Sequence, residues 1–200
     1  MTIELTEVQL DVLLEVINVG AGNAATALSQ LVNRRVDMGV PHIQIMSFND
    51  MVNIIGSDEE ITVAVELKVF GDAPGNILYT MNNDKAYKFA DSLLENYPEK
   101  NDEVYLSLFQ ETGNILGNAF LNAISKFTNL NLITSVPAVA IDMLVAIISS
   151  SFIDAEQYDD YVLSIDTSFM DTSDIDDPGG SFIFIPKPGS LKKILGNLGF

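Results

Sequence analysis

The chain has 200 residues, of which 48% are apolar and 8% aromatic, so it can bury one sizeable core, as one compact domain or two closely packed halves. Its formal charge of -18, from 28 acidic and 10 basic side chains, argues against binding to nucleic acid or to an anionic membrane. The sequence contains no cysteine, which excludes disulfides, thiolate nucleophiles and cysteine-ligated zinc and fits a reducing cytosol.

The N-terminus and the single histidine narrow the choice further. The first ten residues lack a basic region followed by an apolar run, and no apolar stretch is expected to be long and continuous enough to span a bilayer. A soluble, cytoplasmic protein without membrane insertion is therefore expected. His42 has no second histidine to form a cluster with, so we interpret it as an ordinary structural or surface residue.

The first predicted element is a long helix over residues 7–33, which begins with the capping-box spacing of Thr6 and Gln9. Residues 41–48 are predicted as a strand, because the proline at position 41 cannot continue a helix but is tolerated at the first position of a strand. The first half is completed by a short helix over 49–56, a β-hairpin of 61–70 and 75–81, and a closing helix over 84–97.

The second half repeats this order of elements. A helix is predicted over residues 102–128, with Asn101 or Asp102 as its N-cap, and a strand over 137–141. A short helix over 142–152, a hairpin of 161–170 and 180–186, and a closing helix over 191–200 follow. The acidic connection at 171–180 lacks the spacing of an EF-hand, so we interpret it as a solvated turn rather than a calcium site.

A set of polar residues and a proline recurs at a constant separation of 96 residues. Sliding the chain against itself places Asp11, Glu15, Asn18 and Pro41 on Ser107, Glu111, Asn114 and Pro137. Residues 98–102, between the halves, do not have the composition of a flexible linker. We therefore predict an internal duplication, with a single domain built of two repeats, about 1–98 and 99–200.

Each long helix carries its polar residues as one stripe. At about 100° per residue, positions i, i+4 and i+7 lie within about 60° of one another. The first stripe is Asp11, Glu15 and Asn18, extended by Gly22, and the second is Ser107, Glu111, Asn114 and Asn118. Solvent-facing positions tolerate many polar residues and asparagine is a mediocre helix former, so the recurrence indicates a role beyond solubility.

Glycines on the long helices fall into two groups. Gly20, Gly113 and Gly117 lie off the polar stripes, where a missing side chain lets a neighbouring element approach closely. We interpret these as packing glycines. Gly22 lies on the first stripe and would leave a flat place for the backbone of a partner.

The residue types in the stripes restrict the chemistry. Neither stripe contains a nucleophile with an activating base, and one glutamate beside one carboxamide provides too few ligands for a metal. A carboxamide can orient a water molecule, and a glutamate can form an ion pair with a lysine of a docked protein. This combination suits phosphoryl transfer to water when the substrate supplies the electrophile and the metal, so no cofactor bound by this chain is expected.

The pattern [Asp/Ser]-x3-Glu-x2-Asn, followed about two dozen residues later by proline, resembles the CheC-type chemotaxis phosphatases, which include CheX and FliY proteins. The matching segments are DVLLEVIN to Pro41 and SLFQETGN to Pro137, and the similarity extends over essentially the whole chain. The resemblance implies an α+β fold, internally duplicated, with one mixed β-sheet, two long helices packed across it and pseudo-two-fold symmetry. Two intact motifs and no further C-terminal domain favour the two-site CheC subgroup over CheX and FliY, and a monomer.

The activity implied by the resemblance is hydrolysis of the aspartyl phosphate of the response regulator CheY, which binds its own Mg²⁺. Asn18 and Asn114 would then orient the attacking water. Glu15 and Glu111 would pair with the lysine of the regulator. The supporting motif positions would be Asp11, Pro41, Ser107 and Pro137.

The resemblance also implies the receptor deamidase CheD as a further partner. The docking element would be the short helix from Asp142 to Phe152, although core packing equally explains the apolar residues of this helix. Two alternatives to catalysis remain: a binding module that holds phosphorylated CheY or CheD without turnover, and a structural component of the flagellar switch.

Overall fold

The computed structural model describes residues 5–33, 35–39, 42–47, 50, 60–95, 97–156, 161–167, 169–171 and 180–200. Three features predicted from the sequence therefore lie outside the described residues: Pro41, nearly all of the short helix over 49–56, and most of the acidic connection at 171–180.

The helices of the described ranges are α1 (Glu7–Val32), α3 (Asn83–Leu93), α4 (Asp102–Thr128), α5 (Leu144–Asp154) and α6 (Ser190–Asn197). The strands are β1 (Val36–Met38), β2 (His42–Ser47), β3 (Ile61–Gly71), β4 (Gly75–Asn82), β5 (Leu132–Thr134), β6 (Ala138–Met143), β7 (Tyr161–Thr167), β8 (Phe169–Asp171) and β9 (Gly180–Pro186). The long helices and the first hairpin agree with the prediction. The strand predicted over 161–170 is divided, because β7 ends at Thr167 and β8 pairs with β1. Strands β1 and β5 were not predicted.

Side-chain caps define the ends of the two long helices. The predicted capping box of α1 is present: the N–H of Gln9 donates to Thr6 Oγ1, and the N–H of Thr6 donates to Gln9 Oε1. At the start of α4 there is a single cap bond, in which the N–H of Val104 donates to Asn101 Oδ1. Both helices end at an asparagine in the left-handed region, Asn33 with φ 51° and Asn129 with φ 56°, which asparagine tolerates better than most residues.

The main sheet has the strand order β2-β7-β9-β4-β3-β5, with β6 also paired to β3, and β1 and β8 form a separate two-stranded sheet. All these pairs are antiparallel, so the expectation of a mixed sheet is wrong in this respect. The physical reason is that β3–β4 and β7–β9 are hairpins, and the two hairpins join through the antiparallel pair β4–β9. A parallel pair would need a longer crossover connection.

The strand boundaries follow the sequence repeat. β1 and β5 begin 96 residues apart and have the same length, and the same holds for β2 and β6. The caps Asn33 and Asn129 have this separation as well. The elements therefore match along the predicted offset, and the internal duplication remains an inference from this match.

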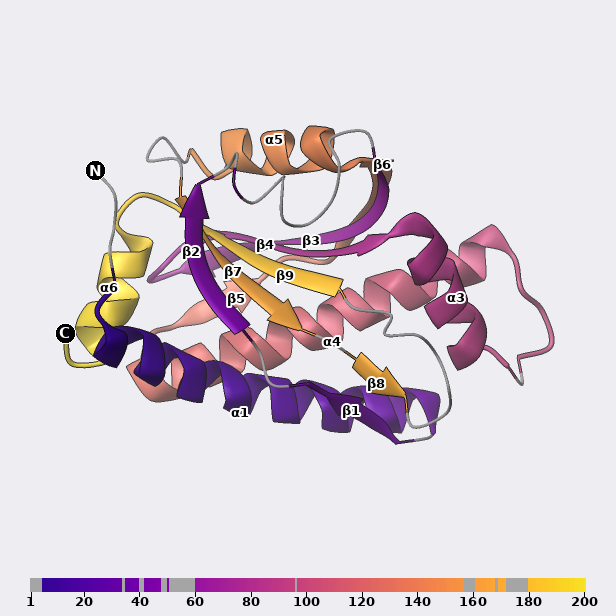
Figure 1. Ribbon diagram of the computed structural model, residues 1–200, viewed down its shortest axis with the longest axis horizontal. Helices are drawn as coiled ribbons and strands as arrows, with labels where there is room; N and C mark the ends of the chain where they lie inside the picture. The colour runs from indigo at the N-terminus through magenta and orange to yellow at the C-terminus, as the bar shows by residue number, and fades with distance from the viewer. Residues whose placement is uncertain are drawn as a thin grey trace.

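The two long helices run antiparallel and side by side across one face of the sheet, and α5 covers the other face (Figure 1). The predicted packing glycines are confirmed. A Cβ atom on Gly20 would lie 3.1 Å from the Cα of Phe120 on the neighbouring helix. A Cβ atom on Gly113 would lie 2.3 Å from Val65 Cγ1 of the sheet, and Gly117 is similarly close to the sheet.

Apolar side chains fill both sides of the sheet. Between the sheet and the long helices, the rings of Phe120 and Phe182 stack with centroids 4.3 Å apart. On the other side, α5 buries Leu144 and Ile148 against Ile183. Most apolar residues of α5 are therefore core residues, which agrees with the interpretation that core packing explains them.

Helix α1 contradicts one expectation about membranes. Its residues Glu7–Leu31 are long and apolar enough to cross a bilayer by length and composition, with a mean hydropathy of 1.3. The buried side chains of Leu13, Val16 and Ile17 explain this hydropathy, because they belong to the core of the protein. A buried core helix meets the same criterion, so the observation is weak support for membrane insertion.

Asp142 differs from the prediction as well. It was expected at the start of a helix but lies in strand β6, opposite Thr62 of β3, and α5 begins only at Leu144. The reason is that β6 completes the sheet along β3, and this long-range pairing decides between strand and helix for an apolar segment. The side chain of Asp142 is exposed and accepts a hydrogen bond from the N–H of Met143.

Candidate functional site

The first polar stripe lies on the surface of α1. Asp11, Glu15 and Asn18 are all exposed, while Leu13 and Ile17 between them are buried in the core. Within the described part of the chain, none of the three stripe residues makes an ion pair or a side-chain hydrogen bond. The carboxylates and the carboxamide are therefore available to a partner.

The second polar stripe lies on α4 and is similar in exposure. Ser107 and Glu111 are exposed, and Asn114 is half-buried. Glu111 forms no ion pair with any described residue. Thus in both stripes a free glutamate stands one helical turn before an asparagine.

The second stripe contains a hydrogen-bond chain that ends on Asn114. Asn118 Nδ2 donates to Asn114 Oδ1 and to the backbone oxygen of Asn114, each at 2.8 Å. Thr134 Oγ1, from strand β5, donates to Asn118 Oδ1 at 3.1 Å. The sequence places Asn118 on the stripe. It does not identify Thr134, because nothing in the sequence shows that this residue, 16 positions after Asn118, contacts it.

The first stripe has no equivalent chain of residues. Gly22 stands at the position of Asn118, and a Cβ atom added to it would meet no atom within 4 Å. Met38 stands at the position of Thr134. The two stripes therefore share their glutamate and asparagine but differ in what supports the asparagine.

The fold keeps the two stripes apart as separate groups. The helices are antiparallel and approach closely where Gly20 meets Phe120. Asn18 precedes Gly20 by two residues and Asn114 precedes Phe120 by six, so the two asparagines lie on opposite sides of this contact, roughly 12 Å apart along the helix axes at 1.5 Å per residue. Pro137 is half-buried and lies between β5 and β6, away from both asparagines in sequence.

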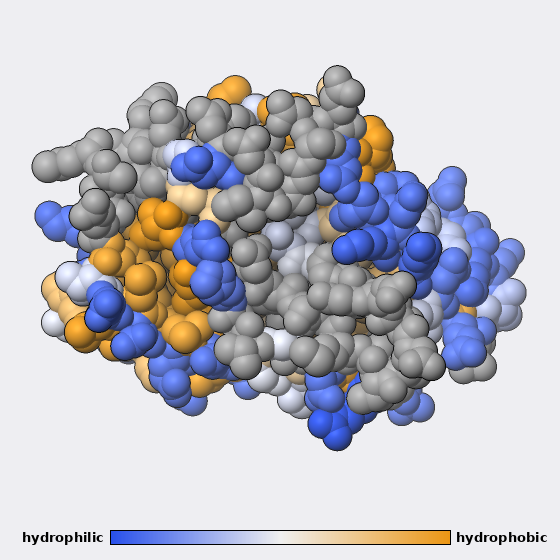
Figure 2. Space-filling model, viewed as in Figure 1, coloured by the Kyte–Doolittle hydropathy of each residue, from blue (hydrophilic) through white to orange (hydrophobic). Residues whose placement is uncertain are grey.

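Most of the basic side chains in the described ranges are already paired with acids. The ion pairs are Arg35–Asp37, Lys68–Asp154, Lys100–Asp91, Lys187–Glu156 and Lys193–Asp72. None of them involves a stripe residue. Hydrophilic residues also cover the end of the molecule where α3 lies (Figure 2). In the described ranges no basic side chain pairs with a stripe carboxylate, and the chain has a net charge of -18, which favours a cationic group on a partner.

Perturbed carboxylates lie outside the stripes. A hydrogen bond from Tyr105, followed by one from Lys100, lowers the pKa of Asp91. A hydrogen bond from Lys68, followed by one from Asn76, lowers the pKa of Asp154. These two pKa shifts arise from contacts of α3 and α5 within the fold, and neither involves a stripe residue.

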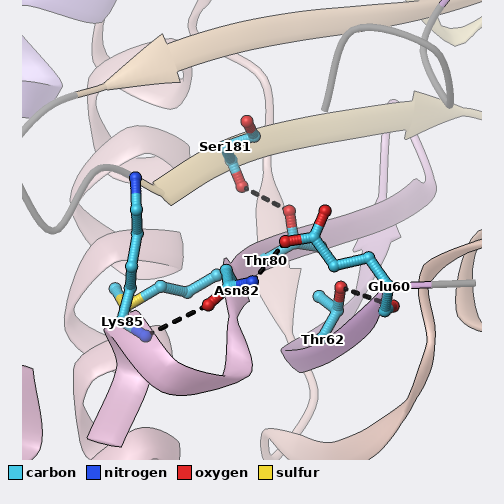
Figure 3. A pocket seen from close by; sticks show the side chains of 7 residues that line it. Glu60, Thr62, Thr80, Asn82, Lys85 and Ser181 are labelled. Atoms are coloured by element: carbon cyan, nitrogen blue, oxygen red, sulfur yellow. Dashed lines mark hydrogen bonds between the residues drawn. The ribbon is translucent and has the colours of Figure 1, made fainter. Parts of the chain in front are cut away.

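A polar cavity of about 220 Å³ opens between β3, β4 and the start of α3 (Figure 3). Asn82 donates to the carboxylate of Glu60 and accepts from the N–H of Lys85 in its wall. The hydroxyl of Thr80 donates to the backbone oxygen of Ser181. No stripe residue lines this cavity. In the described ranges, no group of three or more His, Cys, Asp or Glu side chains is placed to hold a metal.

Comparisons with known proteins agree with this architecture. The model of the CheC-like family matches residues 8–45, which include the first stripe. The protein described as CheY-P phosphatase CheC of Bacillus subtilis strain 168 is 33% identical over 201 residues, covering 98% of this chain and 96% of the relative.

The fold matches that of FliY from Thermotoga maritima with a TM-score of 0.77 at 18% identity, covering 98% of both chains. The fold of the chemotaxis protein CheX from Desulfovibrio desulfuricans matches with a TM-score of 0.54 at 12% identity, covering 86% of this chain and 99% of the other. With a duplicated Glu and Asn pattern on exposed helices, this sheet topology and a relative of this identity over nearly its whole length, the chain belongs to the CheC-like family.

Proposed function

We propose that this protein hydrolyses the aspartyl phosphate of a CheY-type response regulator, at two sites of similar design. The observation that carries the proposal is the pair of stripes, each of which presents an exposed glutamate, unpaired among the described residues, and an asparagine one turn apart. The relative in Bacillus subtilis, which is described as a CheY-P phosphatase, supports the choice of substrate.

The chemistry required is modest because the substrate is an acyl phosphate. Water attacks phosphorus, the bond between phosphorus and the aspartyl oxygen breaks, and the carboxylate of the regulator leaves with the bonding electrons. The Mg²⁺ that neutralises the phosphoryl oxygens belongs to the regulator, so this chain needs no metal ligands. Its contribution is to position water and to hold the partner in register.

Asn18 and Asn114 would place the water, since a carboxamide donates through its NH₂ group and accepts through its oxygen. Glu15 and Glu111 would each form an ion pair with a lysine of the regulator. Asp11 and Ser107, one turn before the glutamates, would contact the edge of the docked protein. Pro41 and Pro137 would be the supporting motif positions, and in the sequence each directly precedes a six-residue strand, β2 or β6.

The wider proposal concerns setting and partners. We propose a cytoplasmic monomer that is one domain of two repeats, about 1–98 and 99–200. A CheD protein is a further partner, docking on α5, where Ile153 is 79% exposed beyond the buried face. The alternative is a binding module that holds phosphorylated CheY or CheD without turnover, and the free carboxylates of the stripes fit docking alone equally well.

The test follows decay of the phosphorylated regulator with the wild type, Asn18→Ala, Asn114→Ala and the double variant. Each single variant should keep part of the acceleration, and the double variant should return decay to the regulator's own rate. Asn197→Ala is a matched control, because this exposed asparagine bonds only the preceding turn of α6. Undiminished acceleration by the double variant would refute the mechanism.

A further inference from the structure

We propose that Asn118 and Thr134 are positioning residues that hold the carboxamide of Asn114 in one orientation, so that the second site is preorganised and the first is not. This inference rests on the proposed function of Asn114. It concerns two side chains that do not touch the reacting atoms, and it predicts a functional difference between two sites with the same glutamate and asparagine.

The orientation of the hydrogen-bond chain follows from one backbone group. The carbonyl of Asn114 can only accept a hydrogen bond, so the side-chain atom of Asn118 that lies 2.8 Å from it must be Nδ2. The same nitrogen lies 2.8 Å from the side chain of Asn114, which must therefore present Oδ1 to it. The oxygen of Asn118 is then left to face Thr134, whose hydroxyl must donate. No other assignment of the two amides satisfies all three contacts.

The consequence for Asn114 is a fixed direction for each end of its carboxamide. Its oxygen is turned toward Asn118 and has one acceptor position occupied, and its NH₂ group is turned away from Asn118. Asn114 thus offers donors to an incoming phosphoryl group or water without first selecting a rotamer. Ordering a side chain in advance removes an entropy cost from the reaction.

The supporting residues are themselves well anchored. Thr134 lies in β5, opposite Val69 of β3, so its backbone is fixed by the sheet. Asn118 is half-buried on α4, and its Oδ1 accepts the hydrogen bond from Thr134 of this strand. The chain therefore connects the rigid sheet to the exposed stripe through two hydrogen bonds.

The first site lacks both supports. Gly22 has no side chain to bond the carboxamide, and Met38 replaces the hydroxyl donor. Asn18 makes no side-chain hydrogen bond to any described residue and is more exposed than Asn114. The side chain of Asn18 is therefore ordered in the rotamer required for the reaction only after the partner has docked.

The experiment measures the second site alone, in an Asn18→Ala background, with the phosphorylated regulator as substrate. In this background Asn118→Ala and Thr134→Val should each lower kcat about three- to tenfold with little change in KM, because they disorder a group that acts on the reaction and not on docking. Thr134→Ser keeps the hydroxyl and should keep kcat. An unchanged kcat in both variants, or a raised KM with unchanged kcat, would overturn the proposal.

The matched control repeats the same substitutions in an Asn114→Ala background, where only the first site acts. Asn118→Ala and Thr134→Val should leave that activity unchanged, and an equal loss there would show general damage to the fold and overturn the specific role. The failure of the proposed function has a different signature. Full activity of the Asn18→Ala, Asn114→Ala double variant refutes the function, whereas an inactive double variant with a normal rate for Asn118→Ala refutes only the positioning role.

Discussion

Single residues on the long helices show how the same amino acid serves two purposes. Gly113 faces the sheet, where an added Cβ atom would lie 2.3 Å from Cγ1 and 2.6 Å from Cβ of Val65. Valine cannot swing away easily, because its side chain is branched at Cβ. Gly22 lies on the exposed stripe of α1 and has open space where its side chain would be. Packing therefore requires the first glycine and does not require the second.

The two glycines predict opposite effects of the same substitution. Gly113→Ala should lower the free energy of unfolding by about 1–3 kcal/mol, because the core is overpacked. Gly22→Ala should raise it by about 0.5–1 kcal/mol, because alanine is the better residue in an exposed helix interior. Urea denaturation of the two variants beside the wild type measures both. Equal changes of the same sign would contradict the packing assignment.

The sequence predicts the stripe residues from the 96-residue repeat together with helical periodicity, and the packing glycines from their positions off the stripes. It cannot predict the hydrogen bond from Thr134 to Asn118, because that contact depends on where β5 comes to lie against α4. Local sequence pattern also does not show which of the two asparagines, Asn18 or Asn114, is oriented by hydrogen bonds from neighbouring side chains.

Among the elements, α5 is attached to the sheet by a polar network as well as by apolar packing. Asn76, 1% exposed on β4, donates from Nδ2 to the oxygens of Ser151 and to the carboxylates of Glu66 and Asp154. The hydroxyl of Ser151 also donates to Glu66 Oε1 at 2.6 Å, and Lys68 pairs with Asp154. The buried amide at the centre therefore links α5 to strands β3 and β4.

Loss of this amide should weaken the fold. Asn76→Ala removes the donor and leaves several acceptors without it, so we expect the free energy of unfolding to fall by about 1–3 kcal/mol. Asn197→Ala, on the exposed side of α6, is the control and should change it by less than about 0.5 kcal/mol. Urea denaturation at neutral pH distinguishes the two, and a similar small effect for both would show that the network contributes little.

The same network predicts a dependence on pH. The pKa of Asp154 lies below its ordinary value of 3.8, first because of the hydrogen bond from Lys68 and then because of that from Asn76. A carboxylate whose pKa is lower in the folded state binds fewer protons there, so its contribution is complete above 3.8 and is lost as the pH falls through the lower, folded value. Unfolding measured from pH 6 down to pH 2 should therefore show a shallower decline in Asp154→Asn than in the wild type. An identical decline in both proteins would show that Asp154 does not contribute to the pH dependence of stability.

Elements are predictable from the sequence where they are long or have strong end signals. The capping box at Thr6 and the cap at Asn101 place both long helices to within a residue or two. β1 and β5 have only three residues each, too few for a period to be seen, and Asp142 is drawn into β6 by its pairing with β3. In both cases long-range pairing, which local pattern does not contain, decides the structure.

The whole molecule combines one continuous antiparallel sheet with two surface stripes on antiparallel helices. The family resemblance implies this arrangement of the halves, and the strand order β2-β7-β9-β4-β3, with β6 paired to β3, is consistent with it. The substrate could not be predicted from geometry, since a glutamate and an asparagine on a helix serve many partners. It follows from the resemblance of the duplicated pattern to the family, to which the comparisons assign the chain.

The stripes are expected to catalyse loss of the phosphoryl group and not merely to bind the phosphorylated regulator. The most direct measurement mixes phosphorylated CheY-type regulator with about one tenth as much of this protein and follows loss of the phosphoryl group. We expect accelerated loss of all the phosphoryl groups, with several turnovers per chain, and decay at the regulator's own rate with the Asn18→Ala, Asn114→Ala double variant. Slower decay that saturates at stoichiometric amounts of protein, or full acceleration by the double variant, would contradict it.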